Sequence, residues 1–441
     1  MASITEILAK AKDDGIKHVR LQFTDILGTP KNIVVPPTRL EEAMEKGIAF
    51  DASSIAGYAT IEESDMIAKA IPDSYVVIPD IIEKTPTARL MCDIYNHGGR
   101  RFPGDPKYML EKVMDRAKEK GFVYHTGPEC EFFLFKTQDG VPTTIPNDSA
   151  TYFDLSTRDI AEGLRAEVSQ AVQQMGFEVY SAHHECAPGQ HEINFAHADA
   201  VTTAERVITL RYVIKAIAMK YGLHATFMPK PVYGIAGSGM HVHQSFMTQA
   251  GENKFYDPKG KNELSPLAYN FIAGLLAHSR EMCAILNSTA NSFKRLVPGF
   301  EAPTYIAWAN RNRSAMIRIP AERGKGTRVE LRNPDGAGNP YLQFAVMLAA
   351  GLDGVDRKLN PPEAIERDIY ELSADEKKKY GIEALPTSFG RSLEFMAESK
   401  LMKDVLGDHI FNHFMHLKSQ EWNDYRAHVT KWEIDKYLPI I

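Results

Sequence analysis

The stretch PECEFFLF, residues 128–135, places two carboxylates in an otherwise apolar run. If this run is a strand, Glu129 and Glu131 lie on the same face, because side chains alternate between the two faces of a strand. Like charges on a half-buried face repel each other, and burying an unpaired carboxylate is costly. The pattern therefore predicts either a polar face in water or a cation held between the two glutamates.

A second pair of glutamates lies in SAHHECAPGQHEINF, residues 181–195, which is typical of a β-hairpin. A two-residue turn at Pro188 and Gly189 would place Glu185 directly opposite Glu192, whereas a longer loop would shift this register. Directly opposed like charges destabilise a strand pair unless a cation bridges them. A solvent-exposed polar face is again the alternative.

Two histidines follow a glycine-rich turn in GSGMHVHQS, residues 237–245. In a strand, His241, His243 and Ser245 would share one face. A lone histidine is more often structural than a ligand. Two histidines with a period of two, in a chain that also carries four paired glutamates, indicate a site.

Arginines are concentrated in one segment, residues 291–332, although the chain as a whole is acidic. They are Arg295, Arg311, Arg313, Arg318, Arg323, Arg328 and Arg332. Glu330 would share a strand face with Arg328 and Arg332, and a structural salt-bridge ladder is the alternative there. One guanidinium group can bind two oxygens of a phosphate or carboxylate at once. Because apolar residues separate these arginines, the segment favours a walled pocket for a small anion over a nucleic-acid surface.

Glutamates with one or two histidines form a donor set rich in oxygen, which suits Mg²⁺ or Mn²⁺ better than zinc or copper. Divalent metals beside arginines are typical of phosphoryl transfer, in which negative charge must be neutralised from several sides. The sequence has neither a GxxxxGK[ST] loop nor the protein-kinase motifs. We therefore expect a nucleotide site of a different architecture.

Composition places limits on the function. The chain has 441 residues, of which 44% are hydrophobic and 24% charged, and its net charge is −6. These values are typical of a globular protein and argue against a general nucleic-acid binder. We see no signal peptide and no apolar run of about 20 residues that could span a membrane. The four cysteines are widely scattered, which favours reduced thiols and a cytoplasmic location.

Hydrophobic patterning predicts an α+β fold with two domains. Near the N-terminus we expect helices at 1–15 and 39–48 and strands at 18–25, 31–35, 74–80 and 88–95. RRFPGDP, residues 100–106, breaks both kinds of element and marks a boundary, so we predict domains at 1–101 and 102–441. In the second domain, helices at 106–121 and 202–222 alternate with strands of a large antiparallel or mixed sheet, and 356–441 is mostly helical.

Six motifs in order, together with FDASSIAGY near the start, closely resemble type I glutamine synthetases of the short prokaryotic class that is not adenylylated. The motifs are PECEFF, HHECAPGQHE, GSGMHVH, KRLVPGFEAP, NRNRSAMIRIP and VELRNPDGAGNPY. The resemblance implies ATP-dependent ligation of ammonia to L-glutamate through γ-glutamyl phosphate, giving L-glutamine, ADP and phosphate. It also implies an N-terminal β-grasp domain and a catalytic domain in which helices flank a curved antiparallel sheet.

The resemblance also assigns roles to residues. Of two metal ions, Mg²⁺ or Mn²⁺, one would be held by Glu131, Glu185 and Glu192 and the other by Glu129, His241 and Glu330. ATP would contact His243, Ser245, Arg313, Arg318 and Arg328, with Arg313 also acting on the transition state. Glutamate would contact Gly237, Arg295, Glu301 and Arg332, with Arg318 as an alternative to Arg332. Asp51 from an adjacent subunit would take a proton from ammonium, and Glu301 would close the site and accept the later proton.

The same resemblance implies a homo-oligomer, a dodecamer of two hexameric rings with shared active sites. Its partners would be glutamate, ammonium and ATP, with small nitrogen-signalling proteins as further candidates, and neither nucleic acid nor membrane. Four positions depart from common family patterns. Ala236 and Ala52 replace an asparagine and a glycine, Thr60 stands where glutamine-inhibited relatives have arginine, and the sequence around Tyr370 differs from the adenylylated motif.

Two other functions fit the same scaffold. One is a ligase that couples glutamate to a larger amine or polyamine; Asp51 and Glu301 favour ammonia over this alternative. The other is a non-catalytic descendant that acts as a nitrogen sensor or structural assembly. Such a protein would be expected to lose metal ligands, whereas all six are present here.

Overall fold

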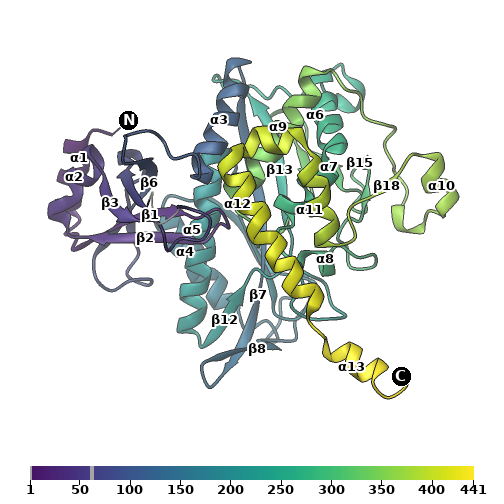
Figure 1. Cartoon of the computed structure of the whole chain (residues 1–441), viewed down its shortest axis with the longest axis horizontal. Helices are drawn as coiled ribbons and strands as arrows, with labels where there is room; N and C mark the ends of the chain where they lie inside the picture. Colours follow the sequence, from purple (N-terminus) through teal and green to yellow (C-terminus); the bar gives the residue numbers. More distant parts are fainter. Residues whose placement is uncertain (1, 60–63) are drawn as a thin grey trace.

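The computed structural model describes residues 2–59 and 64–441. Figure 1 shows a small N-terminal part beside a larger body, and the predicted α+β class is confirmed. The elements of the N-terminal part are α1 (Ile4–Asp13), β1 (His18–Thr24), β2 (Pro30–Val35), α2 (Leu40–Glu45), β3 (Ile48–Asp51), β4 (Asp65–Ala70), β5 (Val76–Ile78) and β6 (Thr87–Asn96). The helices and strands predicted there are confirmed, and sequence reasoning missed β3 and β4.

The N-terminal sheet has the order β2-β1-β6-β4-β3, with β5 also paired to β6. Its central pair, β1 and β6, is parallel, and its other pairs are antiparallel. Alternate residues such as Leu21 and Leu90 are fully buried and pack with Ile7 of α1 and Leu40 of α2. One face of the sheet thus packs against the two helices, as expected for a β-grasp domain.

The larger body contains both long helices and short strands. Its helices are α3 (Pro106–Glu119), α4 (Glu162–Gln174), α5 (Ala200–Lys220), α6 (Pro266–Ala277), α7 (Ser279–Leu286), α8 (Ser292–Arg295), α9 (Pro340–Asp356), α10 (Ala374–Lys379), α11 (Phe389–Glu398), α12 (Lys400–Ala427) and α13 (Lys431–Tyr437). Its strands are β7 (Val123–Gln138), β8 (Val141–Pro146), β9 (Val179–His184), β10 (Gln190–Phe195), β11 (Ala198–Asp199), β12 (Leu223–Thr226), β13 (Met240–Met247), β14 (Tyr305–Ile306), β15 (Trp308–Asn310), β16 (Ile317–Ile319), β17 (Val329–Leu331) and β18 (Glu383–Ala384).

Most of these strands form one sheet with the order β15-β16-β17-β13-β7-β10-β9. Its long central strand β7 also pairs with β8, β11 and β12 along its length. The pairs are antiparallel except for β15 and β16 at one edge, which are parallel. The sequence prediction of a large, mainly antiparallel sheet is therefore confirmed.

The two faces of β7 differ as the alternation of its residues predicted. Phe132 and Leu134 are fully buried in the main core, which includes side chains of α3, α5 and α9. On the other face, Phe133 and Phe135 stack on each other and pack against Ala187. The glutamates of PECEFFLF share this second face, which therefore presents both an apolar patch and the carboxylates of the candidate site.

The turn of the β9–β10 hairpin differs from our prediction. Glu192 lies opposite His183, and the backbone amide of Glu185 donates to the carbonyl of Gln190 at 2.7 Å. The expected direct pairing of Glu185 with Glu192 is therefore wrong. Gly189 has a φ of +69°, and Pro followed by such a glycine is typical of a type II turn, whose twist does not fit a two-residue hairpin. The loop is consequently longer and the register shifts.

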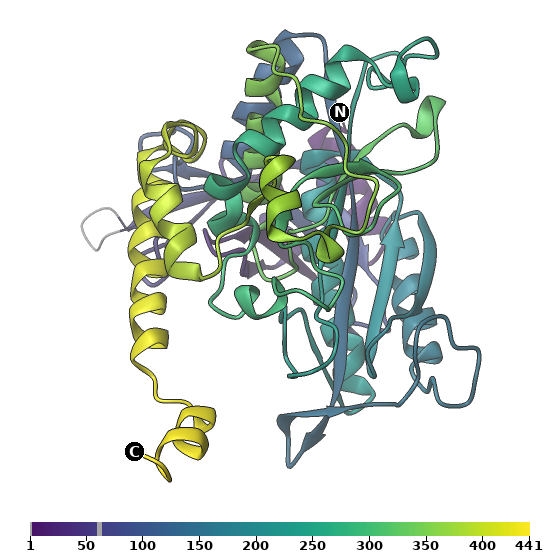
Figure 2. The same cartoon turned by 90° about the vertical axis from the view of Figure 1, so that its right-hand side faces the viewer.

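The C-terminal helices lie along one side of the body. α12 is interrupted at Gly407, where the backbone has non-helical dihedral angles. α13 projects away from the rest of the chain in both views (Figures 1 and 2). Among the helices described for this chain, none is both long and apolar enough to cross a membrane.

Candidate active site

Four neighbouring strands bring five of the six predicted metal ligands together on one face of the sheet. Glu131 of β7 lies directly opposite Glu192 of β10, and Glu129 of β7 lies opposite His241 of β13. Glu330 of β17 pairs with His243, two residues beyond His241. Because all these residues project from the same face, the sheet register alone gathers them.

The first ligand group consists of Glu129, His241 and Glu330, whose candidate ligand atoms lie within 4.8 Å of one another. Nδ1 of His241 is 2.9 Å from Glu129 Oε2 and 3.8 Å from Glu330 Oε1. Glu330 is 1% exposed and forms ion pairs with Arg318 (2.5 Å) and Arg332 (3.3 Å). The Arg318 contact lacks hydrogen-bond alignment, so Glu330 Oε2 is buried without a hydrogen-bond partner.

The second group consists of His183, Glu185 and Glu192, again with candidate ligand atoms within 4.8 Å. Nε2 of His183 is 3.0 Å from Glu185 Oε1 and 3.7 Å from Glu192 Oε1. Sequence reasoning missed His183, although its period-two spacing from Glu185 places it on the same strand face. Glu131 lies between the two groups, with Oε1 4.0 Å from His241 and Oε2 accepting the Gly239 amide at 2.8 Å.

The electrostatics of the two groups differ. Burial raises the pKa of Glu192 well above its ordinary value, and the nearby carboxylates, Glu129 first among them, raise it further. Burial also favours the protonated form of Glu129, but hydrogen bonds to His241 and His243 outweigh this effect and hold the pKa of Glu129 well below its usual range. Without a cation, the site thus contains mutually repelling carboxylates that burial penalises.

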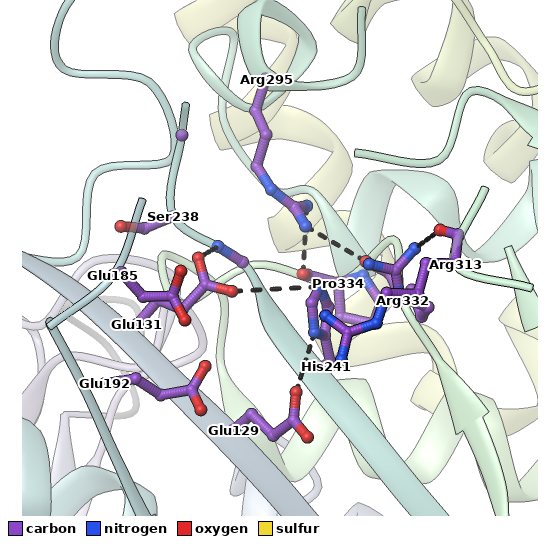
Figure 3. A network of polar contacts seen from close by, with 12 residues as sticks. Glu129, Glu131, Glu185, Glu192, Ser238, His241, Arg295, Arg313, Arg332 and Pro334 are labelled. Atoms are coloured by element: carbon purple, nitrogen blue, oxygen red, sulfur yellow. Dashed lines mark hydrogen bonds and ion pairs between the residues drawn. The ribbon is translucent and has the colours of Figure 1, made fainter. Parts of the chain in front are cut away.

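A divalent cation would relieve this repulsion. Figure 3 shows the carboxylates of Glu129, Glu131, Glu185 and Glu192 gathered on one side of the site. The donor set is mainly carboxylate oxygen with histidine nitrogen. This chemistry fits a hard cation such as Mg²⁺ or Mn²⁺.

These carboxylates share a cavity of about 210 Å³ with cationic side chains. Its cationic lining includes Arg313, Arg318 and Arg332, and Glu301 and Tyr152 also contribute. Sequence reasoning missed Tyr152, which carries no motif of its own. Arg332 donates to the backbone carbonyl of Arg313, and Figure 3 shows both beside the carboxylates. The cavity therefore combines metal-ligand chemistry with groups that neutralise an anionic ligand.

A second cavity, of about 300 Å³, lies on the far side of His243. His243, Ser245 and Arg328, all predicted at the nucleotide, line it. Arg328 donates to His243 Nδ1 at 3.3 Å, and His243 Nε2 lies 2.8 Å from Glu129 Oε1. This chain of contacts links the second cavity to the first ligand group.

A smaller cavity adjoins the carboxylate cavity and shares Glu131, Glu185 and His241 with it. Gly237, Ala236, Arg295, Glu301 and Arg332 contribute to its wall. Arg295 is 3% exposed and donates to the backbone carbonyls of Arg332, Asn333 and Pro334 at 2.8–3.2 Å. The residues predicted at glutamate are thus brought together, and Arg295 also anchors the strand end that follows Glu330.

Asp51 lies outside these cavities. It is an exposed residue at the end of β3 in the N-terminal domain, where it accepts the Ser53 amide at 2.8 Å. The structure of one chain therefore does not bring Asp51 to the other predicted site residues. Thr60 lies outside the described residues. The Tyr370 hydroxyl donates to the Ala302 carbonyl, and Ala52 is fully buried.

A β-grasp domain joined to a sheet that carries two carboxylate–histidine groups beside arginines defines a metal-dependent enzyme acting on anionic substrates. The chain matches the family description "Glutamine synthetase, beta-Grasp domain" over residues 15–97 and "Glutamine synthetase, catalytic domain" over residues 103–437. It belongs to the glutamine synthetase family, and the resemblance seen in the sequence motifs is confirmed.

Individual relatives agree with this assignment. The chain is 50% identical to the glutamine synthetase of Thermus thermophilus and 48% identical to that of Clostridium saccharobutylicum, with 98% of each chain covered in both comparisons. Among solved structures, it resembles a GmaS/ADP complex, with a TM-score of 0.90 and 34% identity, covering 99% of this chain and 100% of the other. The glutamine synthetase of Plasmodium falciparum, 23% identical, has the same fold, with a TM-score of 0.88 and 99% of each chain covered.

Proposed function

We propose that this chain is a glutamate–ammonia ligase, which uses ATP to join ammonia to L-glutamate through γ-glutamyl phosphate and releases L-glutamine, ADP and phosphate. This reaction assimilates ammonium. The observation that carries the proposal is the pair of ligand groups on one face of the sheet and its β9–β10 loop, next to cavities that arginines line.

In this proposal, two divalent cations, Mg²⁺ or Mn²⁺, are held by the six residues predicted from the sequence. One cation is held by Glu131, Glu185 and Glu192, with His183 beside it. The second cation is held by Glu129, His241 and Glu330. When bound, such ions neutralise phosphate charge during phosphoryl transfer. The separation of the ligands into two groups supports this assignment.

ATP would occupy the cavity beyond His243, in contact with Ser245 and Arg328. Arg313 and Arg318 lie in the neighbouring cavity, where they would face the transferred phosphoryl group. Guanidinium groups fixed at this position stabilise developing negative charge without reorganisation. The ADP of the 34% identical GmaS complex supports a nucleotide site in this fold.

Glutamate would occupy the smaller cavity, between Gly237, Arg295 and Arg332. Glu301 lines both this cavity and the carboxylate cavity. Its φ of +62° is an uncommon conformation for a residue with a side chain and is typical of a functional loop. We assign Glu301 to close the site against water and to accept a proton from the attacking amine.

Asp51 would complete the ammonium site of a neighbouring subunit. Its exposure, and its absence from the cavities of its own chain, support a shared site in a homo-oligomer. Exposed apolar residues of the projecting α13, including Trp432 and Ile434, support contacts with other copies. We propose the dodecamer of two six-membered rings, located in the cytoplasm, with small nitrogen-signalling proteins as candidate partners.

The same proposal divides the chain into a β-grasp domain at 1–101 and a catalytic domain at 102–441. The family matches at 15–97 and 103–437 support a boundary in this region. The separate hydrophobic core of the N-terminal part also supports it, since its buried members run from Ile7 to Phe102.

The test is phosphate release from ATP in the presence of glutamate and Mg²⁺, with and without ammonium. We expect turnover that depends on ammonium, with glutamine as the product. Turnover only with polyamines or larger amines would contradict the proposal and favour the amine ligase. ATP binding without turnover would favour a sensor. Repeating the assay with millimolar glutamine tests whether Thr60 removes feedback inhibition, in which case turnover persists.

A further inference from the structure

The β9–β10 hairpin carries a second polar cluster on the face opposite the metal ligands. His184 and His191 alternate with His183, Glu185 and Glu192, so they point to the other side of the hairpin. There they meet Asp148, and the side chains of Asp148, His184 and His191 are all 0% exposed. None of the roles assigned above uses this cluster.

Asp148 holds both ends of the loop that carries Glu185. Its Oδ1 accepts a hydrogen bond from His184 Nε2 at 3.0 Å, just before the loop, and from the Gly189 amide at 2.9 Å, near its end. Nδ1 of His184 lies 2.7 Å from the carbonyl of Glu185 itself. Both ring nitrogens of His184 therefore face acceptors, so both donate, and the ring forms an ion pair with Asp148.

The hairpin is also fixed from α4. Nη1 of Arg165 lies 2.9 Å from His191 Nδ1, and Arg165 pairs with Asp159 through two nitrogens at 3.0 and 2.6 Å. Because a guanidinium can only donate, His191 Nδ1 is an acceptor and the ring proton sits on Nε2. That nitrogen lies 3.9 Å from Asp148 Oδ2.

These contacts argue against a third metal site, although Asp148, His184 and His191 have metal-ligand chemistry and spacing. Both nitrogens of His184 carry protons, and those of His191 are occupied by Arg165 and by its own proton. No imidazole lone pair is left for a metal, and Arg165 already places a positive charge beside the cluster. The cluster is therefore better suited to holding the hairpin than to binding an ion.

We propose that Asp148 is a positioning residue for the metal ligand Glu185, acting through His184 and Gly189; this inference rests on the proposed function. Glu185, Glu192 and Glu131 repel one another until a cation arrives, and a free loop would relax by moving Glu185 away. With both ends of the loop tied to one buried carboxylate, Glu185 stays close to Glu192. Residues that support metal ligands in this way typically change metal affinity by about 10- to 100-fold.

The test measures Mn²⁺ binding to the full oligomer without substrates, by electron paramagnetic resonance and calorimetry. For Asp148→Ala, we expect the site at Glu131, Glu185 and Glu192 to weaken by about 10- to 100-fold and the other site to change by less than about twofold. Asp148→Asn keeps the Oδ1 that accepts both hydrogen bonds, so it should restore most of the affinity. Asp105→Ala is the matched control, because it removes a different buried carboxylate, the N-cap of α3, which also accepts a backbone amide. It should lower the melting temperature and leave Mn²⁺ affinity unchanged.

Equal weakening of both Mn²⁺ sites by Asp148→Ala, or unchanged affinity at both, would overturn the inference. If Asp148→Ala does not fold, His184→Gln replaces it: this variant keeps a donor for Asp148 but loses the bond to the Glu185 carbonyl. Unchanged affinity in His184→Gln would then refute the proposal. Because the measurement requires no turnover, it is separate from the proposed function. A wild-type protein without ammonium-dependent turnover would refute that function and leave this test intact.

Discussion

Glu129 and His241 lie directly opposite each other on β7 and β13, with Oε2 and Nδ1 2.9 Å apart. On the other side of β7, Glu131 lies opposite Glu192 of β10. Five of the six candidate metal ligands thus come from strands of a single sheet, and Glu185 comes from the loop between β9 and β10. Strands hold side chains more rigidly than loops do, so these five ligands are placed before a cation arrives.

The first prediction concerns Glu192. Because the pKa of Glu192 is raised, the folded metal-free protein binds more protons than the unfolded chain. The stability of the fold therefore falls as the pH rises from the unfolded pKa of Glu192 through its folded pKa. Glu192→Gln removes a buried charge, and we expect it to stabilise the metal-free protein at pH 7.5 by about 1 kcal/mol. It should also abolish most of the rise in melting temperature that Mg²⁺ gives the wild type. Calorimetry with EDTA and with Mg²⁺ checks both effects, with Glu45→Gln on the surface as the control. A variant less stable than the wild type in EDTA would contradict this account.

The second prediction concerns Glu301. Glu301→Ala should lower the rate of glutamine synthesis by about 100-fold or more, because the substitution removes a general base and a barrier to water together. The affinity for ATP should stay within about threefold, since Glu301 does not line the cavity beyond His243. Ammonium-dependent turnover and nucleotide titration measure the two quantities. Full activity in Glu301→Ala would remove this residue from its proposed role.

The third prediction tests the shared active site. Asp51→Ala and Arg328→Ala should each be nearly inactive, because each removes one side of the site. If Asp51 acts in a neighbouring subunit, unfolding and reassembling a one-to-one mixture should restore about one quarter of wild-type activity, since that fraction of sites receives both native residues. Each variant reassembled alone is the control. A mixture as inactive as its components would show that Asp51 does not act between subunits.

The sequence allowed the face of each strand to be predicted, because the period of two is a property of the backbone. This is why Glu129 and Glu131 could be placed on one face of their strand, and His241 and His243 on one face of theirs, from the sequence alone. The register between β9 and β10 could not be predicted in the same way. It depends on the backbone of the turn at Pro188 and Gly189, whose twist shifts the pairing by two residues.

Other parts of the site leave no pattern in the sequence. Tyr152 reaches the carboxylate cavity from an irregular segment, where no periodicity predicts its direction. Asp148 lies in another such segment and reaches the hairpin only through tertiary packing. His183 could have been found, because it stands two residues before Glu185 on a predicted strand. The role that we propose for Asp51 involves a second copy of the chain, which the sequence alone does not place.

The last prediction concerns stability far from the site. His278 joins α6 to α7; its Nε2 lies 2.8 Å from Asp353 of α9, and its Nδ1 lies 3.2 Å from Glu281. Burial lowers the pKa of His278, but hydrogen bonds to these carboxylates outweigh burial and raise this pKa above its ordinary value. The stabilisation that protonated His278 gives the fold is therefore fully present below its unfolded pKa of about 6.5, and it is lost as the pH rises through its folded pKa. Glu281 and Asp353 have lowered pKa values, so the stability that their charged forms contribute is lost only in acid, as the pH falls through their folded pKa values.

We expect His278→Gln to lower the free energy of unfolding by about 1 kcal/mol near pH 6 and by less at pH 9. The value is small for hydrogen bonds to charged groups because the His278 side chain is partly exposed. Arg357 also pairs with Asp353, at 2.8 Å, and would keep part of the contact in the variant. Thermal unfolding of both proteins across this pH range checks the prediction, with exposed His18→Gln as the control. A difference in stability that stays constant or grows between pH 6 and pH 9 would show that the charge of His278 contributes nothing.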